Sequence, residues 1–136
     1  MKISARNQFS GKVTNIQKGA VNSIVALDVN GTQITATISN IAVEELDLKE
    51  GSAATAVIKA TEVLMAQGSL QISARNKFEG KVSSVEKGAV NSIVKLTTNI
   101  GNVTSTISNS AVDELGLAEG VDATAVIKAT SVMIGC

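Results

Sequence analysis

The sequence contains no histidine, and its single cysteine, Cys136, is its last residue. Histidine is the commonest general base of enzymes and the commonest ligand of transition metals. Serine and cysteine nucleophiles usually need such a base beside them, and none is available here. A disulfide within the chain is also impossible, which favours a reducing compartment. We therefore predict that the protein is not an enzyme and that it works in the cytoplasm.

The chain also has very few aromatic residues, and its net charge is zero. The chain has two Phe, no Tyr and no Trp, and its twelve basic residues equal its twelve acidic ones. Proteins that bind nucleic acid usually present a basic face, and those that bind single strands stack bases on aromatic rings. No apolar run reaches the length of a membrane span, and the first residues lack a signal-peptide core. We expect no nucleic-acid partner and no membrane partner.

What the sequence does contain is a duplication of almost its whole length. Roughly 40 of about 67 aligned positions are identical without a gap, which marks a duplicated domain and not a short repeat. The two copies therefore report which positions have drifted and which have not. The longest identical segments are Ile3–Asn7 with Ile72–Asn76, Lys18–Val25 with Lys87–Val94, and Ala54–Thr61 with Ala123–Thr130.

The duplication predicts two domains, residues 1–66 and 70–136, with a short polar linker at Ala66-Gln67-Gly68-Ser69. A unit of this size buries only a limited core, and the scarcity of aromatic side chains makes each core poorer still. Pairing of the units, or assembly with other chains, would supply the missing buried area. We therefore expect an oligomer.

Each repeat has the sequence pattern of short β-strands. Residues 9–14 and 25–29 alternate between apolar and polar side chains, with a period of two. Asn30-Gly31 is a strong hairpin signal between the second strand and a third, residues 34–38, which is rich in β-branched residues. The tip of this hairpin differs in the second repeat, as an exposed loop is free to do.

The alternation breaks after the third strand. Ser39 and Asn40 are possible caps for one or two helical turns over 42–46. Residues 54–61 then predict a further strand, and 63–65 a last one. The fold class predicted is all-β, with two tandem OB-like five-stranded barrels that each carry a short helix. The alternative is a generic small β-sandwich.

Three segments that are identical in both repeats are rich in hydrogen-bond donors. Ser4 and Arg6, repeated as Ser73 and Arg75, would point to the same side of an extended segment, and the arginine fork suits an oxyanion. The alternative is a solvated polar start to a strand. Lys59, with its copy Lys128, lies inside the apolar strand predicted over 54–61 and would face a buried anion or extend to solvent.

The third segment is Lys18-Gly19-Ala20-Val21-Asn22, repeated as Lys87–Asn91. A turn that contains glycine and small neighbours can aim successive backbone N–H groups at an anion. The alternative is a plain turn, since glycine often supplies unusual backbone dihedrals. The acidic residues Glu44, Glu45 and Asp47 would form a cation site or, more simply, a solvated helix face. The candidate sites are rich in donors and poor in acceptors, which indicates an oxyanion ligand.

Three motifs give the chain a family resemblance. Ser-Ala-Arg-Asn-x-Phe, Lys-Gly-Ala-Val-Asn-Ser and Val-Ile-Lys-Ala occur in this order, at matched spacing, in both repeats. In this respect the chain resembles the tandem Mop domains of the molbindins. The resemblance implies OB-like units, assembly as a homotrimer, and binding of molybdate, and of tungstate, between units, with no organic cofactor.

The resemblance also implies the site residues. In sites between units it places Ser4, Arg6, Ala20, Val21 and Lys59, with Ser73, Arg75, Ala89, Val90 and Lys128. Near the three-fold axis it places Gly19, Asn22, Gly88 and Asn91. The function implied is intracellular molybdate binding for storage or homeostasis. The alternative is a molybdate-responsive module that binds a protein partner.

Overall fold

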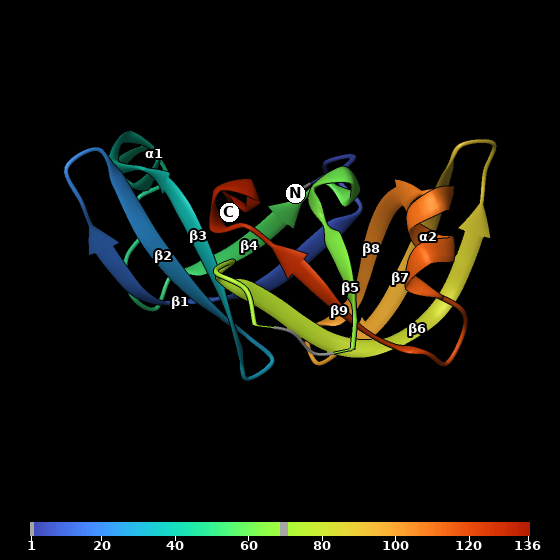
Figure 1. The fold of residues 1–136 in the computed structure, drawn as a ribbon. Helices are drawn as coiled ribbons and strands as arrows, with labels where there is room; N and C mark the ends of the chain where they lie inside the picture. The colour runs from blue at the N-terminus through green and yellow to red at the C-terminus, as the bar shows by residue number, and fades with distance from the viewer. Residues whose placement is uncertain (1, 69–70) are drawn as a thin grey trace.

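The computed structural model describes residues 2–68 and 71–136 of the chain (Figure 1). Met1, Ser69 and Leu70 lie outside the described residues. Met1 and Leu70 are the first residues of the two predicted domains, and Ser69 is the last residue of the predicted linker. The domain limits 1–66 and 70–136 therefore stay a prediction.

Both repeats form the same series of elements. The first repeat forms β1 (Asn7–Lys18), β2 (Asn22–Val29), β3 (Thr32–Ser39), α1 (Asn40–Glu45), β4 (Ala53–Ile58), the 3-10 turn η1 (Ala60–Glu62) and β5 (Leu64–Gln67). The second repeat forms β6 (Asn76–Lys87), β7 (Asn91–Thr98), β8 (Gly101–Ser108), α2 (Asn109–Leu115), β9 (Asp122–Ile127), the 3-10 turn η2 (Ala129–Ser131) and β10 (Met133–Gly135). The prediction of an all-β fold with two five-stranded units and a short helix in each is confirmed.

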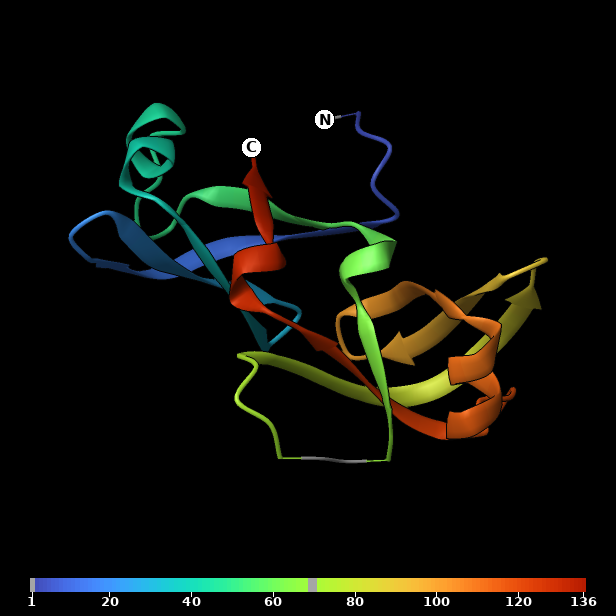
Figure 2. The same ribbon diagram turned by 45° about the horizontal axis from the view of Figure 1, so that its top comes forward.

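The two sheets exchange their outer strands. The strand order is β10-β4-β1-β2-β3 in one sheet and β5-β9-β6-β7-β8 in the other, with antiparallel pairing throughout. Met133 of β10 pairs with Val57 of β4, and Leu64 of β5 pairs with Val126 of β9. Figure 2 shows β5, in light green, crossing to the second half, while the red C-terminal strand lies over the first. The sequence pattern predicted these strands but not the exchange.

The hairpin between β2 and β3 is formed as the sequence predicts. Val29 pairs with Thr32, and Asn30 and Gly31 between them have φ of 53° and 84°, which is the left-handed pair of a type I′ turn. In the second repeat Ile100 occupies the glycine position, and the positive φ falls on Gly101 instead. The drift in sequence therefore changes the turn while it keeps the hairpin.

Two predicted boundaries differ from the structure. The helix begins at Asn40, two residues earlier than predicted, because the Ser39 hydroxyl accepts a hydrogen bond from the Ala42 N–H. The predicted strand 54–61 ends at Ile58, and η1 follows Lys59. Lys59 is therefore an exposed residue of the strand-to-turn connection and not a strand residue, and its role as an anion ligand stays a prediction.

The hydrophobic core extends through both repeats. Its most buried side chains in the first repeat include Leu27, Ile34 and Ile58, and the equivalent Leu96, Val103 and Ile127 are equally buried. These positions come from neighbouring strands and face one side of each curled sheet, as the alternating pattern predicts.

Two buried asparagines join the repeats. Asn7 Nδ2 donates to the Thr104 carbonyl at 2.8 Å, and the Thr104 N–H donates to Asn7 Oδ1 at 2.7 Å. Asn76 makes the same pair of bonds with Thr35, both at 2.8 Å. Each asparagine is 1% exposed. The last residue of the Ser-Ala-Arg-Asn motif is therefore structural, and it ties the first strand of one repeat to the third strand of the other.

Candidate functional site

The antiparallel pairing of β1 with β4 brings two of the three motifs together. Asn7 pairs with Ile58, so the residues just before β1 lie beside those just after β4. Ser4, Arg6 and Lys59 consequently line one hollow of about 310 Å³, called the first hollow below. The sequence predicted these residues as a donor set, and the fold gathers them within one repeat.

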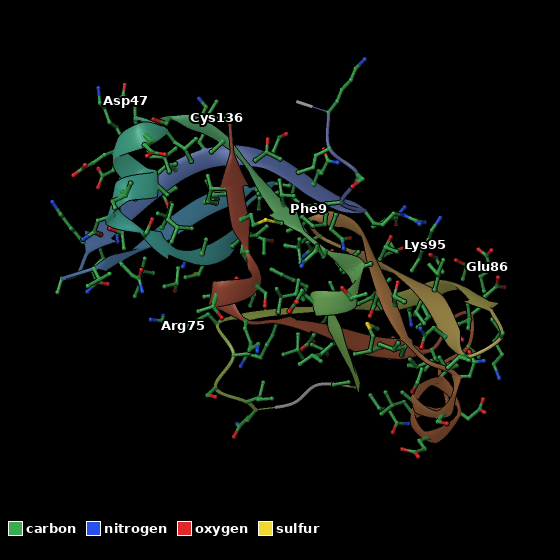
Figure 3. All side chains as sticks on the ribbon, turned by 90° about the horizontal axis from the view of Figure 1, so that it is seen from above. Phe9, Asp47, Arg75, Glu86, Lys95 and Cys136 are labelled. Carbon is green, nitrogen blue, oxygen red and sulfur yellow. The ribbon has the colours of Figure 1, made fainter. Side chains whose placement is uncertain are left out.

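The second repeat builds an equivalent hollow. Asn76 pairs with Ile127, and Ser73, Arg75 and Lys128 line a hollow of about 340 Å³, called the second hollow. The same geometry thus arises twice from the same sequence. Figure 3 labels Arg75 at the surface of the molecule, next to the start of β6.

The exchanged strands complete both hollows. Met133 of β10 lines the first hollow, and Leu64 of β5 lines the second. Ile3 and Ile72 add a further exposed apolar side chain to each. Each hollow is therefore lined by both polar and apolar side chains, and each contains residues of both repeats.

The cations of the two hollows have no carboxylate partner among the described residues. The ion pairs found in residues 2–68 and 71–136 join Lys49 to Asp47, Lys81 to Asp122 and Lys87 to Asp113. Neither hollow is lined by an acidic side chain. Arg and Lys together give each hollow a charge of +2, and both groups donate hydrogen bonds without accepting them. This arrangement suits a dianion.

The Gly-Ala-Val-Asn segments form the turns β1–β2 and β6–β7, as predicted. In each turn the glycine N–H donates to the asparagine carbonyl at 2.8 Å. A Cβ on Gly19 would lie 2.7 Å from the Asn22 oxygen, so this turn needs glycine because two backbone segments approach closely. Neither Gly19 nor Gly88 has a positive φ, so these turns use glycine for the close approach and not for an unusual backbone dihedral.

Successive backbone donors of these turns are free. Among the hydrogen bonds between described residues, none is donated by the N–H groups of Ala20 and Val21 or of Ala89 and Val90. The two valines are 73% and 71% exposed. The turns therefore present both N–H groups and an apolar side chain to the surroundings.

Sequence reasoning missed the residue that fixes each turn. Asn40 Nδ2 donates to the Gly19 carbonyl at 3.0 Å, its N–H donates to the Val21 carbonyl at 2.8 Å, and its Oδ1 accepts from the Ser23 hydroxyl at 2.5 Å. Asn109 repeats these contacts in the second repeat. The same residue, asparagine, stands at this position in both repeats, which could have pointed to this role. The sequence pattern predicted Asn40 only as a helix cap.

Within each repeat, the turn and the hollow lie at opposite ends of one strand. Arg6 and Arg75 come directly before β1 and β6, and the turns come directly after these strands. A straight strand of twelve residues spans about 40 Å. Figure 3 shows this separation, with Glu86 near the tip of the β6–β7 hairpin and Arg75 at the other end of β6. If a hollow and a turn share a ligand, the turn therefore comes from outside that repeat.

Other site types find little support in the described part of the chain. Within residues 2–68 and 71–136, no group of three or more His, Cys, Asp or Glu is placed to hold a metal ion. Glu44 and Glu45 are the last two residues of α1, and both are exposed, as expected for a solvated helix face. None of the helices described is long and apolar enough to cross a membrane.

Comparison with known proteins gives a family match to both repeats. The TOBE domain matches residues 3–65 and again residues 72–134. Among curated proteins, the chain is 46% identical over 138 residues to the molybdenum transport protein ModE of Herbaspirillum seropedicae, covering 98% of the chain and 51% of that protein. It is 38% identical over 140 residues to the molybdenum-pterin-binding protein MopA of Rhodobacter capsulatus, covering 98% of the chain and 52% of that protein. The chain thus spans about half the length of these curated relatives.

A solved structure matches the whole chain. The cytoplasmic molybdate-binding protein ModG, in a crystal form with molybdate bound, superposes with a TM-score of 0.95 at 41% sequence identity. The match covers 99% of each chain. The arrangement of the two repeats is therefore the same in both proteins.

Proposed function

The chain belongs to the TOBE-domain family, and from that premise we propose that it binds molybdate at sites shared between chains. The family resemblance inferred from the three motifs is confirmed by the match of both repeats. The proposed activity is ligand binding and not catalysis. It rests on the relatives that are named for molybdenum, and on the chemistry of the two hollows.

One observation supports the proposal above all others. The fold twice gathers a serine hydroxyl, an arginine and a lysine in one hollow, without a carboxylate among the lining residues. Charge-assisted hydrogen bonds from such cations are about twice as strong as neutral ones. Two positive charges match the two negative charges of a tetrahedral molybdate ion at neutral pH. Ser4, Arg6 and Lys59 are the proposed ligands in the first hollow, and Ser73, Arg75 and Lys128 in the second.

Each hollow is poor in acceptors, because no carboxylate lines it and its two charged groups only donate, and this favours a fully deprotonated oxyanion. Phosphate is partly protonated at neutral pH, and its hydroxyl would have to donate a hydrogen bond inside the site. The lysine and arginine groups cannot accept it. An unmatched polar hydrogen in a closed site costs about 1–3 kcal/mol. Molybdate and tungstate have no such hydrogen, so we expect both to bind.

We place the proposed sites between chains because each hollow is open on one side in the single chain. The free N–H groups of Ala20 and Val21, and of Ala89 and Val90, would complete the shell around an anion held in the hollow of a neighbouring chain. The exposed valine side chain would pack against the apolar side chains that line the same hollow. We propose a homotrimer, in which anion binding and assembly stabilise one another. Gly19, Asn22, Gly88 and Asn91 would shape sites nearer the three-fold axis.

The likeness to ModG supports a cytoplasmic role in molybdate storage or homeostasis. A molybdate-responsive module that binds a protein partner remains the alternative, since the relative ModE is about twice as long as the matched segment. In either role the anion site is the same.

Calorimetric titration at neutral pH tests the proposed function. We expect molybdate to bind with about two hollow sites per chain, and tungstate to compete for them. Phosphate should bind at least tenfold more weakly, which corresponds to about 1.4 kcal/mol. Sulfate serves as a control for a smaller dianion. The absence of heat with molybdate, or equal affinity for phosphate, would contradict the proposal.

A further inference from the structure

A carboxylate next to the first hollow has no counterpart in the second repeat. Glu62 is the last residue of η1, and Ser131 occupies the equivalent position in η2. The Ser131 hydroxyl donates a hydrogen bond of 3.1 Å to Glu62 Oε2, between the two repeats. Glu62 is half-buried. Its carboxylate is therefore held in place by a neutral partner, and none of the ion pairs between described residues includes it.

Glu62 lies near the lysine of the first hollow. The Glu62 N–H donates to the Lys59 carbonyl at 2.9 Å and closes the 3-10 turn, in which side chains three residues apart project to the same side. Both side chains line a separate hollow of about 250 Å³, together with Ser131 and Met133. This hollow shares Lys59 and Met133 with the first hollow and Thr130 with the second, and Lys59 is the one cation among its described lining residues. Lys128, three residues before the neutral Ser131, does not line it.

We propose that Glu62 makes the two oxyanion sites unequal, so that the site around Lys59 binds a dianion more weakly than the site around Lys128. This inference rests on the proposed function. Repulsion between this carboxylate and a dianion in the adjoining hollow corresponds to a roughly threefold to tenfold loss of affinity at the effective dielectric constant of a protein surface. The duplicated chain would then fill its sites in order, the second hollow first.

Two single-site variants separate the affinities. Arg75→Ala leaves the first hollow as the intact site, and Arg6→Ala leaves the second. Calorimetric titration of both variants with molybdate at low ionic strength should give tighter binding to the Arg6→Ala protein, by roughly threefold to tenfold. Added salt should shrink this difference because it screens the carboxylate, whereas a difference in packing would persist.

Glu62→Gln tests the charge without changing the shape, since the amide oxygen can still accept from Ser131. In the Arg75→Ala protein it should tighten molybdate binding by the same factor, and in the Arg6→Ala protein it should leave binding unchanged. The double exchange Glu62→Ser with Ser131→Glu should reverse the order of the two sites. Equal affinities in both backgrounds, or a Glu62→Gln effect of equal size in both, would overturn the inference. Failure of the unsubstituted protein to bind molybdate would count against the proposed function instead.

Discussion

Replacing Arg6 and Arg75 together by alanine should remove most molybdate binding. Each arginine is an exposed cation in a hollow that contains no carboxylate among its described lining residues. Loss of a charge-assisted hydrogen bond costs about 1.5–3 kcal/mol, which corresponds to a roughly tenfold to hundredfold weaker affinity at each site. Calorimetric titration of the double variant measures the loss.

The matched control for this experiment is Lys49→Ala. Lys49 is also an exposed cation, but it pairs with Asp47 at 3.5 Å after α1 and lines neither hollow. Its removal changes the net charge without touching a proposed ligand. Arg6→Lys with Arg75→Lys should restore only part of the affinity, because lysine keeps the charge but lacks the planar fork. A double alanine variant with unchanged stoichiometry and affinity would refute the assignment of both arginines.

Replacing Asn7 or Asn76 by alanine should lower the free energy of unfolding by about 2–5 kcal/mol. Each substitution removes two hydrogen bonds between the repeats and leaves a buried N–H and a buried carbonyl of a threonine without a partner. Every buried side-chain N and O among the described residues has a hydrogen-bond partner in the native fold. The unpaired threonine groups of the variant would therefore be a new defect. Urea unfolding of the purified variants measures the change.

Asn15→Ala is the control for the asparagine variants. Asn15 lies on the same strand, β1, and its side chain is exposed. Surface substitutions of this kind usually change stability by less than about 0.5 kcal/mol. If Asn7→Ala were as mild as Asn15→Ala, the side chain would not hold the two repeats together, and the conserved identity of Asn7 with Asn76 would need another explanation.

The strands and hairpins could be predicted because their causes are local. The alternation over β1 and the left-handed pair Asn30-Gly31 both follow from neighbouring residues. The strand exchange could not be predicted in this way. Residues 54–58 of β4 and 123–127 of β9 are identical, so β5 finds the same pairing surface in either repeat. The choice between them depends on the path of the chain and not on the local pattern.

In the candidate site, too, some features follow from the local sequence and others depend on contacts between distant segments. Ser4, Arg6 and Lys59 could be named from the sequence because a donor-rich motif was repeated, and the pairing of Asn7 with Ile58 brings them together. The exposure of Lys59 and the distance from the hollow to the turn depend on where β4 ends and on how long β1 is. The support of the turn by Asn40 also depends on the meeting of segments distant in sequence.

Native mass spectrometry with and without molybdate tests the central claim most directly, because it reports the number of subunits and the number of bound anions together. The claim is that the anion is held by the hollow of one chain and the turn of another. We expect a trimer that carries molybdate, with no anion retained on monomers. The Arg6→Ala and Arg75→Ala double variant should form fewer anion-loaded trimers. A monomer that binds molybdate as tightly as the assembled protein would contradict the claim.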